Sequence, residues 1–194
     1  MKFVLVPVLA CALCLLPGPA PAAEDLDSSW YMAMAVGAMR YQQDGLQDYD
    51  LNDYRLVLGK NLNRNFAVEA HAGTGSDDTQ QVYGLPVNLS VDYYVAGFLR
   101  ANLTFAPQLW DNNRLRLYGM LGGTFIETTS SDPVTTRSGS QGSIAAGVGM
   151  EIFVDNLGIQ IGYTRYVHES NNDNDYSLDS AHLGFIYEFS NMFD

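Results

Sequence analysis

The spacing of apolar side chains limits the fold of this chain more than any other feature of its sequence. Bulky apolar residues recur at every second position, and small or polar residues lie between them. In residues 143–154 one set is Ile144, Ala146, Val148, Met150, Ile152 and Val154, and the other is Ser143, Ala145, Gly147, Gly149 and Glu151. Side chains two apart share a face of a β-strand. The pattern therefore predicts strands with one apolar face and excludes amphipathic helices.

Eight such segments follow one another along the chain: 30–41, 52–62, 66–74, 90–102, 114–126, 142–154, 158–168 and 180–189. Most have close to the ~9–11 residues with which a tilted strand crosses a bilayer. In the first segment Met32 and Met34 alternate with Ala33 and Ala35, which leaves its phase open. The prediction is an all-β fold, an eight-stranded antiparallel up-and-down transmembrane β-barrel.

The expected connections differ in length in a regular way. Residues 63–65 and 155–157 form short turns, whereas 42–51, 75–89, 127–141 and 169–179 form long loops, and 103–113 is intermediate. Outer-membrane barrels have short periplasmic turns and longer external loops. The lengths therefore predict an orientation with both termini in the periplasm.

Composition excludes several classes of protein. The net charge is -12 and the pI is near 4.4, which argues against a protein that binds the phosphate backbone of nucleic acids. The 47% apolar fraction is too high for a disordered acidic tail.

The beginning of the chain has the features of an export signal. Residues 1–22 combine Lys2, an apolar run and Ala20-Pro21-Ala22, the pattern of a cleaved signal peptide, which leaves one domain at 23–194. Both cysteines, Cys11 and Cys14, lie in this segment. We therefore expect no disulfide, no thiolate-bound metal and no cofactor in the domain.

The small interior of an eight-stranded barrel decides which face points inward, because its own side chains fill it. The bulky residues fit better against lipid, and aromatic residues near strand ends would form two interfacial belts. These belt residues are Tyr31, Tyr54, Phe66, Phe105, Trp110, Phe125, Tyr163 and Phe189. The opposite face is rich in glycine and charge, and burial requires its charges to pair. The predicted interior ion-pair lattice consists of Arg55, Glu69, Asp92, Arg100, Arg116, Glu151 and Glu188, with His71 as a hydrogen-bonded filler.

The last segment resembles the C-terminal signal of outer-membrane proteins. A polar residue, a glycine and two aromatic residues two positions apart provide the resemblance: His182, Gly184, Tyr187 and Phe189. The stretches 63–69, 94–100 and 158–166 are similar to recurring stretches of the small OmpA/OmpX-like outer membrane protein β-barrel domain family. The resemblance implies location in the outer membrane and recognition of the last strand by the barrel-assembly machinery.

The filled interior and the acidic loops lead to the favoured function. General diffusion of solutes is not expected through a plugged lumen, although a narrow ion-leaky path along the lattice is an alternative. Eleven loop carboxylates would lie at the surface: Asp44, Asp48, Asp50, Asp77, Asp78, Glu127, Asp132, Glu169, Asp173, Asp175 and Asp179. Divalent cations could bridge them to lipopolysaccharide phosphates. We favour a non-enzymatic barrel with a structural, adhesion or surface-binding role carried by these loops.

Two other classes remain open. His168 and Ser170 lie two apart, and the stretch 168–171 resembles the His-x-Ser-Asn of outer-membrane lipid A 3-O-deacylases. The resemblance implies Ser170 as nucleophile and His168 as general base, with Asp179 in place of the missing Glu. The other class is a soluble barrel of lipocalin type, which would be extracted without detergent.

Overall fold

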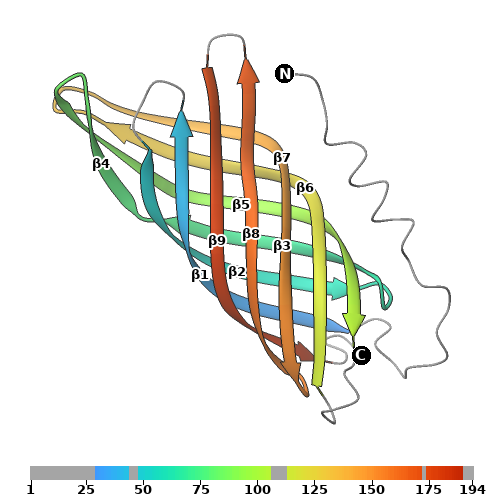
Figure 1. The fold of residues 1–194 in the computed structure, drawn as a ribbon. Coiled ribbons are helices and arrows are strands. Elements are labelled where there is room, and N and C mark those ends of the chain that lie inside the picture. Colours follow the sequence, from blue (N-terminus) through green and yellow to red (C-terminus); the bar gives the residue numbers. More distant parts are fainter. Residues whose placement is uncertain (1–28, 44–47, 106–112, 172–173, 190–194) are drawn as a thin grey trace.

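The chain forms a closed antiparallel barrel in the computed structural model, which describes residues 29–43, 48–105, 113–171 and 174–189 (Figure 1). Side chains are described in these ranges except at 168–171 and 174–175. The strands are β1 (Trp30–Gln43), β2 (Tyr49–Asn61), β3 (Phe66–Gly75), β4 (Asp77–Val82), β5 (Leu85–Phe105), β6 (Asn113–Ser131), β7 (Thr136–Val154), β8 (Leu157–Asn171) and β9 (Asn174–Phe189). No helix among the described residues is long and apolar enough to span a membrane.

The nine strand segments form the eight strands of the barrel wall. β3 and β4 are separated only by Ser76, and both pair with β5, so together they form one interrupted strand of the wall. Each other strand pairs with its neighbours in sequence, and β1 pairs with β9 from Trp30↔Phe189 to Gln43↔Tyr176, which closes the cylinder. The predicted all-β, eight-stranded barrel is confirmed.

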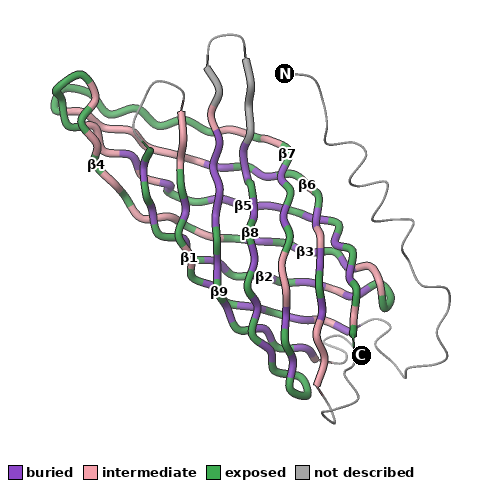
Figure 2. The backbone as a smooth tube through the Cα atoms, viewed as in Figure 1, coloured by how far each residue is buried: buried purple, intermediate pink, exposed green. Residues whose placement is uncertain are grey.

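The two faces of the wall alternate as the sequence predicts (Figure 2). Bulky residues point outward on every strand of the barrel wall, and β1 settles its phase with Met32 and Met34 outside and Ala33 and Ala35 inside. Outward residues include Leu56, Leu58, Val95, Leu99, Leu121, Phe125, Val148, Ile152, Ile159, Ile161, Leu183 and Phe185, each between 42% and 66% exposed. An apolar outer surface of this extent requires hydrocarbon around it.

Tyr31 is an exception to the predicted aromatic belts. Its side chain is fully buried and its hydroxyl donates to Glu69 Oε1 at 2.8 Å. The residue has the parity of Ala33 and Ala35, which places it on the inner face once the phase of β1 is fixed. Trp110 lies outside the described residues.

The two ends of the barrel differ. At the turn end, the short turns 62–65 and 155–156 are as expected, although the connection 106–112 lies outside the described residues. At the extended end, two of the predicted loops are largely strand. The segment 75–89 contains β4, a two-residue turn at Tyr83 and Gly84, and the start of β5, and the segment 127–141 contains the ends of β6 and β7. Their Ser, Thr and Gln residues carry no apolar alternation, so the sequence gives no signal of strand there.

Inward and outward glycines of this barrel differ in the space around them, so adding a methyl group should affect stability in opposite ways. A Cβ at inward Gly149 would lie 2.7 Å from the carbonyl oxygen of Ile161 and would also strike the ring of Tyr118. A Cβ at outward Gly97 would meet nothing within 4 Å.

We expect Gly149→Ala to lower the free energy of unfolding by about 1–3 kcal/mol because it overpacks the interior. Gly97→Ala should leave it unchanged or raise it by about 0.5–1 kcal/mol, since glycine weakens a strand. Urea unfolding of the protein refolded in lipid vesicles measures both, and equal effects of the two variants would contradict the assignment of the faces.

Candidate functional site

A chain of alternating charges occupies the interior of the barrel. Arg100, on β5, is 1% exposed and lies between two carboxylates, with Nη1 2.5 Å from Glu69 Oε1 and Nη2 2.6 Å from Glu151 Oε2. Arg116 Nη1 is 3.3 Å from the same oxygen of Glu151, and its Nη2 is 2.7 Å from Glu188 Oε1. The chain of charges thus joins β3, β5, β6, β7 and β9 across the lumen.

The last carboxylate of this chain, Glu188, is shared with a third arginine. Arg114 Nη2 lies 2.7 Å from Glu188 Oε2 and donates to the backbone oxygen of Asp155 at 3.0 Å. This arginine is partly exposed at the turn end, so the charge chain ends at the rim of the barrel.

A second group of polar side chains lies nearer the extended end. Arg55 Nε donates to Asp53 Oδ2 at 3.0 Å, and Tyr94 donates its hydroxyl proton to Asp53 Oδ1 at 2.7 Å. Ser180, on β9, donates to the same carboxylate at 2.5 Å. Asp53 is fully buried, so three partners from three other positions on the wall satisfy its charge.

Tyr166 and His71 join the two groups. The Tyr166 hydroxyl lies 3.5 Å from that of Tyr94 and 3.4 Å from His71 Nδ1. His71 Nε2 lies 3.1 Å from Glu69 Oε2. The predicted role of His71 as a hydrogen-bonded interior residue agrees with these contacts.

Apolar side chains are packed among the interior charges and beside them. Towards the extended end, Met39, Leu51, Val91, Ile126 and Leu178 belong to one buried cluster. Towards the turn end, a second cluster contains Tyr31, Ala33, Val57, Ala67, Phe153 and Ile186. Hydrophobic constrictions oppose the passage of ions, and the cluster at the extended end forms one.

The structure places six of the seven predicted lattice residues in the interior and one outside. The six are Arg55, Glu69, Arg100, Arg116, Glu151 and Glu188. Asp92 is exposed, because a β-bulge between Val91 and Tyr93 inserts it as an extra residue and turns it outward. It accepts a hydrogen bond from Thr129 at 2.6 Å on the outer surface.

Asp53 and Arg114 were missed by the sequence reasoning. Asp53 lies two residues from Arg55 and therefore on the same face of β2, so parity alone could have found it. Arg114 is the first charged residue of β6, and its role depends on the approach of β9, which local sequence does not show.

The predicted hydrolase residues are only partly within the described region. The side chains of His168 and Ser170 lie outside it, although their backbones pair with Ser177 and Asp175. Asp179 is bound by Arg165, whose Nε and Nη2 lie 2.6 and 3.0 Å from its two oxygens.

The residues of the predicted assembly signal lie on both faces of β9. His182 and Gly184 point inward, and Tyr187 points outward, where its ring lies 6.2 Å from that of Phe189. The inward pair packs against β8 and β1, since a Cβ at Gly184 would lie 2.5 Å from the Met34 carbonyl oxygen.

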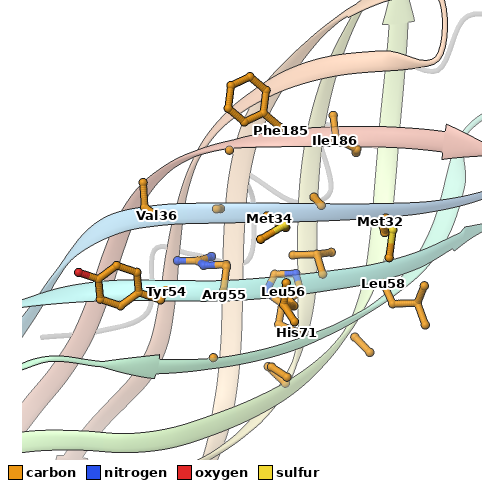
Figure 3. A pocket seen from close by; sticks show the side chains of 18 of the residues that line it. Met32, Met34, Val36, Tyr54, Arg55, Leu56, Leu58, His71, Phe185 and Ile186 are labelled. Carbon is orange, nitrogen blue, oxygen red and sulfur yellow. The ribbon is translucent and has the colours of Figure 1, made fainter.

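A depression of about 1770 Å³ lies along the wall. Its lining consists largely of outward apolar side chains, among them Met32, Met34, Leu56, Leu58 and Phe185 (Figure 3). The polar residues in its lining, among them Arg55 and His71, belong to the inner face, and the apolar outer part suits contact with lipid. Within the described ranges, no three His, Asp or Glu side chains are grouped to hold a metal ion.

Removing one interior carboxylate tests the charge chain. We expect Glu151→Gln to lower the free energy of unfolding by about 3–5 kcal/mol, because it leaves Arg100 and Arg116 short of a buried counter-charge. Arg40→Gln breaks the exposed pair with Asp50 and should have no measurable effect. Urea unfolding in vesicles gives both values, and a Glu151 variant as stable as the wild type would refute the role of this carboxylate.

Comparison with known proteins agrees with this geometry. Residues 8–189 match the family model described as outer membrane protein beta-barrel domain. No curated relative matches the sequence significantly. Solved structures are similar to this chain at low sequence identity. At this level the similarity concerns the fold alone.

Three different proteins are represented among the structures with TM-scores above 0.5. Ail, the attachment invasion locus protein of Yersinia pestis, has a TM-score of 0.61 and 18% identity over 84% of this chain and 100% of its own. Neisserial surface protein A has a TM-score of 0.55 and 14% identity, over 82% and 97%. The N-terminal barrel of Pseudomonas aeruginosa OprF has a TM-score of 0.51 and 15% identity, over 81% and 97%. With a sealed barrel, an apolar outer wall and a family match over nearly its whole length, the chain belongs to the outer membrane protein beta-barrel domain family and is a protein of the outer membrane.

Proposed function

We propose that this chain is a non-enzymatic surface-binding protein whose external end contacts partners outside the cell. One observation carries the proposal. The interior is filled by ion pairs and packed apolar side chains, whereas four strands continue at the extended end as a sheet beyond the barrel (Figure 1). Function in such a barrel belongs to its external surface, and a conducting channel has less support.

The external sheet consists of β4 and the outer parts of β5, β6 and β7. The outward face of β5 changes from the apolar Tyr93, Val95 and Leu99 to the polar Asn88 and Ser90, which indicates where lipid ends. From Leu85 to Asp92, β5 extends roughly 25 Å at about 3.3 Å per residue.

Tight turns order the tips of this sheet. Tyr83 and Gly84 have φ angles of 52° and 82°, which suits the two-residue turn between β4 and β5. At the other tip, the Asp132 carboxylate accepts the N–H groups of Val134 and Thr135 at 2.8 Å, and these bonds lower the pKa of Asp132. A pre-ordered sheet loses little entropy on binding.

The charge of the sheet restricts its partners. Residues 76–92 and 126–145 carry five carboxylates, at Asp77, Asp78, Asp92, Glu127 and Asp132, and a single basic residue, Arg137. Ail has been solved in complex with the heparin analogue sucrose octasulfate. The acidic sheet of the present chain disfavours such a polyanion, so we propose neutral or basic partners. Contact with lipopolysaccharide phosphates would then require bridging divalent cations.

Shortening the sheet tests the proposal. We expect replacement of 77–90 and of 128–139, each by Asn-Gly, to retain the barrel. Glu127 and Ser140, which flank the second cut, are a cross-strand pair, and Ser76 and Val91, which flank the first, adjoin the pair of Asp77 and Ser90. Cells expressing the shortened protein should lose most of their adherence to a panel of immobilised extracellular proteins. Wild-type cells should not adhere to immobilised heparin.

Heat-modifiable gel mobility provides the control for folding of the shortened barrel. Full adherence by cells whose shortened protein shows the folded mobility would contradict the external sheet as the binding site. Preferential adherence of wild-type cells to heparin would contradict the proposed partner charge.

The absence of enzymatic activity is tested at Ser170. We expect cells expressing Ser170→Ala and wild-type protein to have the same lipid A acyl pattern by mass spectrometry, because Asp179 is engaged by Arg165 and is not free to orient a histidine. An acyl chain released only by the wild type would establish a hydrolase.

A further inference from the structure

The exposed surface of the external sheet is polar between the lipid-facing wall and the turns at its outer end. Positions 76–81, 127–131 and 136–143 contain no large apolar side chain. On β5, Leu89 and Val91 are apolar, but both are buried. The sheet therefore leaves the apolar wall of the barrel through a polar zone.

The two turns at the outer end differ from this zone in composition. Residues 82–87 and 132–135 carry one charge, at Asp132, and are otherwise largely apolar: Val82, Tyr83, Leu85, Pro86, Val87, Pro133 and Val134. Tyr83 is 96% exposed, Val134 is 88% exposed and Leu85 is 55% exposed. Contiguous exposed apolar side chains mark a site of interaction with a protein or a membrane.

The two turns lie next to each other and form one patch, residues 82–87 and 132–135, which we call the tip. Asn88 and Ser131 are the outermost pair of β5 and β6, so Leu85 and Val134, each three positions beyond that pair, follow beside one another. Tyr83 belongs to the turn that joins β4 to β5, where Val82 pairs with Leu85. Both turns lie together at the upper left of Figure 1.

The backbone of the tip is suited to an apolar environment. Pro86 and Pro133 have no N–H group. The Asp132 carboxylate accepts the N–H groups of Val134 and Thr135 at 2.8 Å each, and the Asp132 N–H donates to Thr135 O at 2.9 Å. An unpaired backbone donor is costly wherever water is excluded. These turns can therefore approach an apolar phase at little cost.

The tip stands too far out to contact the hydrocarbon of the membrane that holds the barrel. The part of β5 from Leu85 to Asp92 is roughly 25 Å long. Even at a strand tilt of about 45°, this length raises the tip roughly 18 Å above the apolar wall. The apolar side chains of the tip therefore suit a surface outside this membrane.

We propose that the tip binds the surface of an opposing lipid bilayer, into which Tyr83, Leu85 and Val134 insert at the depth of the headgroups. This inference rests on the proposed surface-binding function and names a lipid surface as a partner. Tyrosine is enriched at membrane interfaces because its ring is apolar and its hydroxyl is polar. Binding of this kind increases with the apolar area buried, and many copies on one cell reinforce one another.

The charges around the tip select the kind of lipid. Asp132 lies in the tip, and Asp77 and Asp78 lie on the adjoining β4, whereas Arg137 is the nearest basic residue in the sequence. Attraction to anionic lipids depends on clustered lysine and arginine. The carboxylates of the sheet instead repel anionic headgroups. The opposing surface should therefore consist of zwitterionic lipid, such as phosphatidylcholine.

A tryptophan at the tip reports contact with lipid directly. With Tyr83→Trp protein in nanodiscs, we expect added vesicles of brominated phosphatidylcholine to quench the fluorescence that the variant gains over the wild type. Ser140→Trp, on the polar part of β7, should not be quenched. Vesicles of brominated phosphatidylglycerol should not quench Tyr83→Trp. Unchanged fluorescence of the wild-type protein, which contains Trp30 and Trp110, controls for transfer of brominated lipid into the nanodiscs.

Serine variants test the side chains of the tip. Tyr83→Ser combined with Val134→Ser should weaken flotation of the nanodiscs with phosphatidylcholine vesicles roughly tenfold or more, because it removes most of the apolar area that inserts. Leu62→Ser removes an exposed apolar side chain from a turn at the other end of the barrel and should bind like the wild type. Heat-modifiable gel mobility establishes that each variant is folded.

Four outcomes would overturn the proposal. They are an unquenched Tyr83→Trp, equal quenching of Ser140→Trp, a preference for phosphatidylglycerol, and equal flotation of the folded tip variant and the wild type. Association of wild-type nanodiscs without vesicles, lost in the tip variant, would assign the tip to a second copy instead. Loss of adherence to immobilised proteins by the tip variant, with no quenching of Tyr83→Trp, would assign it to a protein partner.

Adherence distinguishes this inference from the proposed function. If phosphatidylcholine vesicles leave Tyr83→Trp unquenched while the shortened sheet abolishes adherence to extracellular proteins, the external sheet still binds partners and only the lipid contact is refuted. If the shortened protein also supports full adherence, the proposed function itself is refuted.

Discussion

The pairing of charges inside the barrel is the interaction on which the rest of the structure depends. An apolar outer wall leaves charged side chains no place but the lumen or the ends, and each buried charge needs a partner. Four carboxylates (Asp53, Glu69, Glu151 and Glu188) face four arginines (Arg55, Arg100, Arg114 and Arg116). Arg100, Arg114 and Arg116 bind carboxylates on other strands, whereas Arg55 binds Asp53 on its own strand. The pairs between strands also help to fix the register of the closed wall.

Inward glycines make room for the tyrosines that bind these carboxylates. A side chain at Gly59 or Gly73 would strike Tyr31 or Tyr94, both of which hydrogen-bond to the interior carboxylates. The glycine-rich face and the ion pairs are therefore two parts of one solution to filling a narrow cylinder. Apolar side chains complete the filling, with a buried cluster beyond the charges at the extended end and Phe153 packed on Arg114 and Arg116 at the turn end.

Sequence period predicted the outer wall well because lipid selects bulky residues at every second position. It placed Leu56, Val148 and Phe185 outside and Arg100 and Glu151 inside, as the structure has them. It misplaced Asp92 because a bulge reverses the parity of the strand without any residue that marks it. The external parts of β5, β6 and β7 escaped prediction for another reason: outside lipid, neither face of a strand needs apolar groups, so strand and loop have the same composition.

One residue links the packing of the interior to the course of β8. Tyr166 points into the lumen, where its ring centroid lies 5.3 Å from Cζ of Arg55 and its hydroxyl contacts His71 and Tyr94. To reach that place as the extra residue of a bulge, it turns β8 away from β7 at Arg165. A β8 without the bulge could continue along β7 and cover residues 136–145, but its parity beyond Arg165 would change and Val167 would no longer point inward with Tyr166. The bulge that brings Tyr166 among the interior charges thus lies at the point where the pairing of β8 with β7 ends.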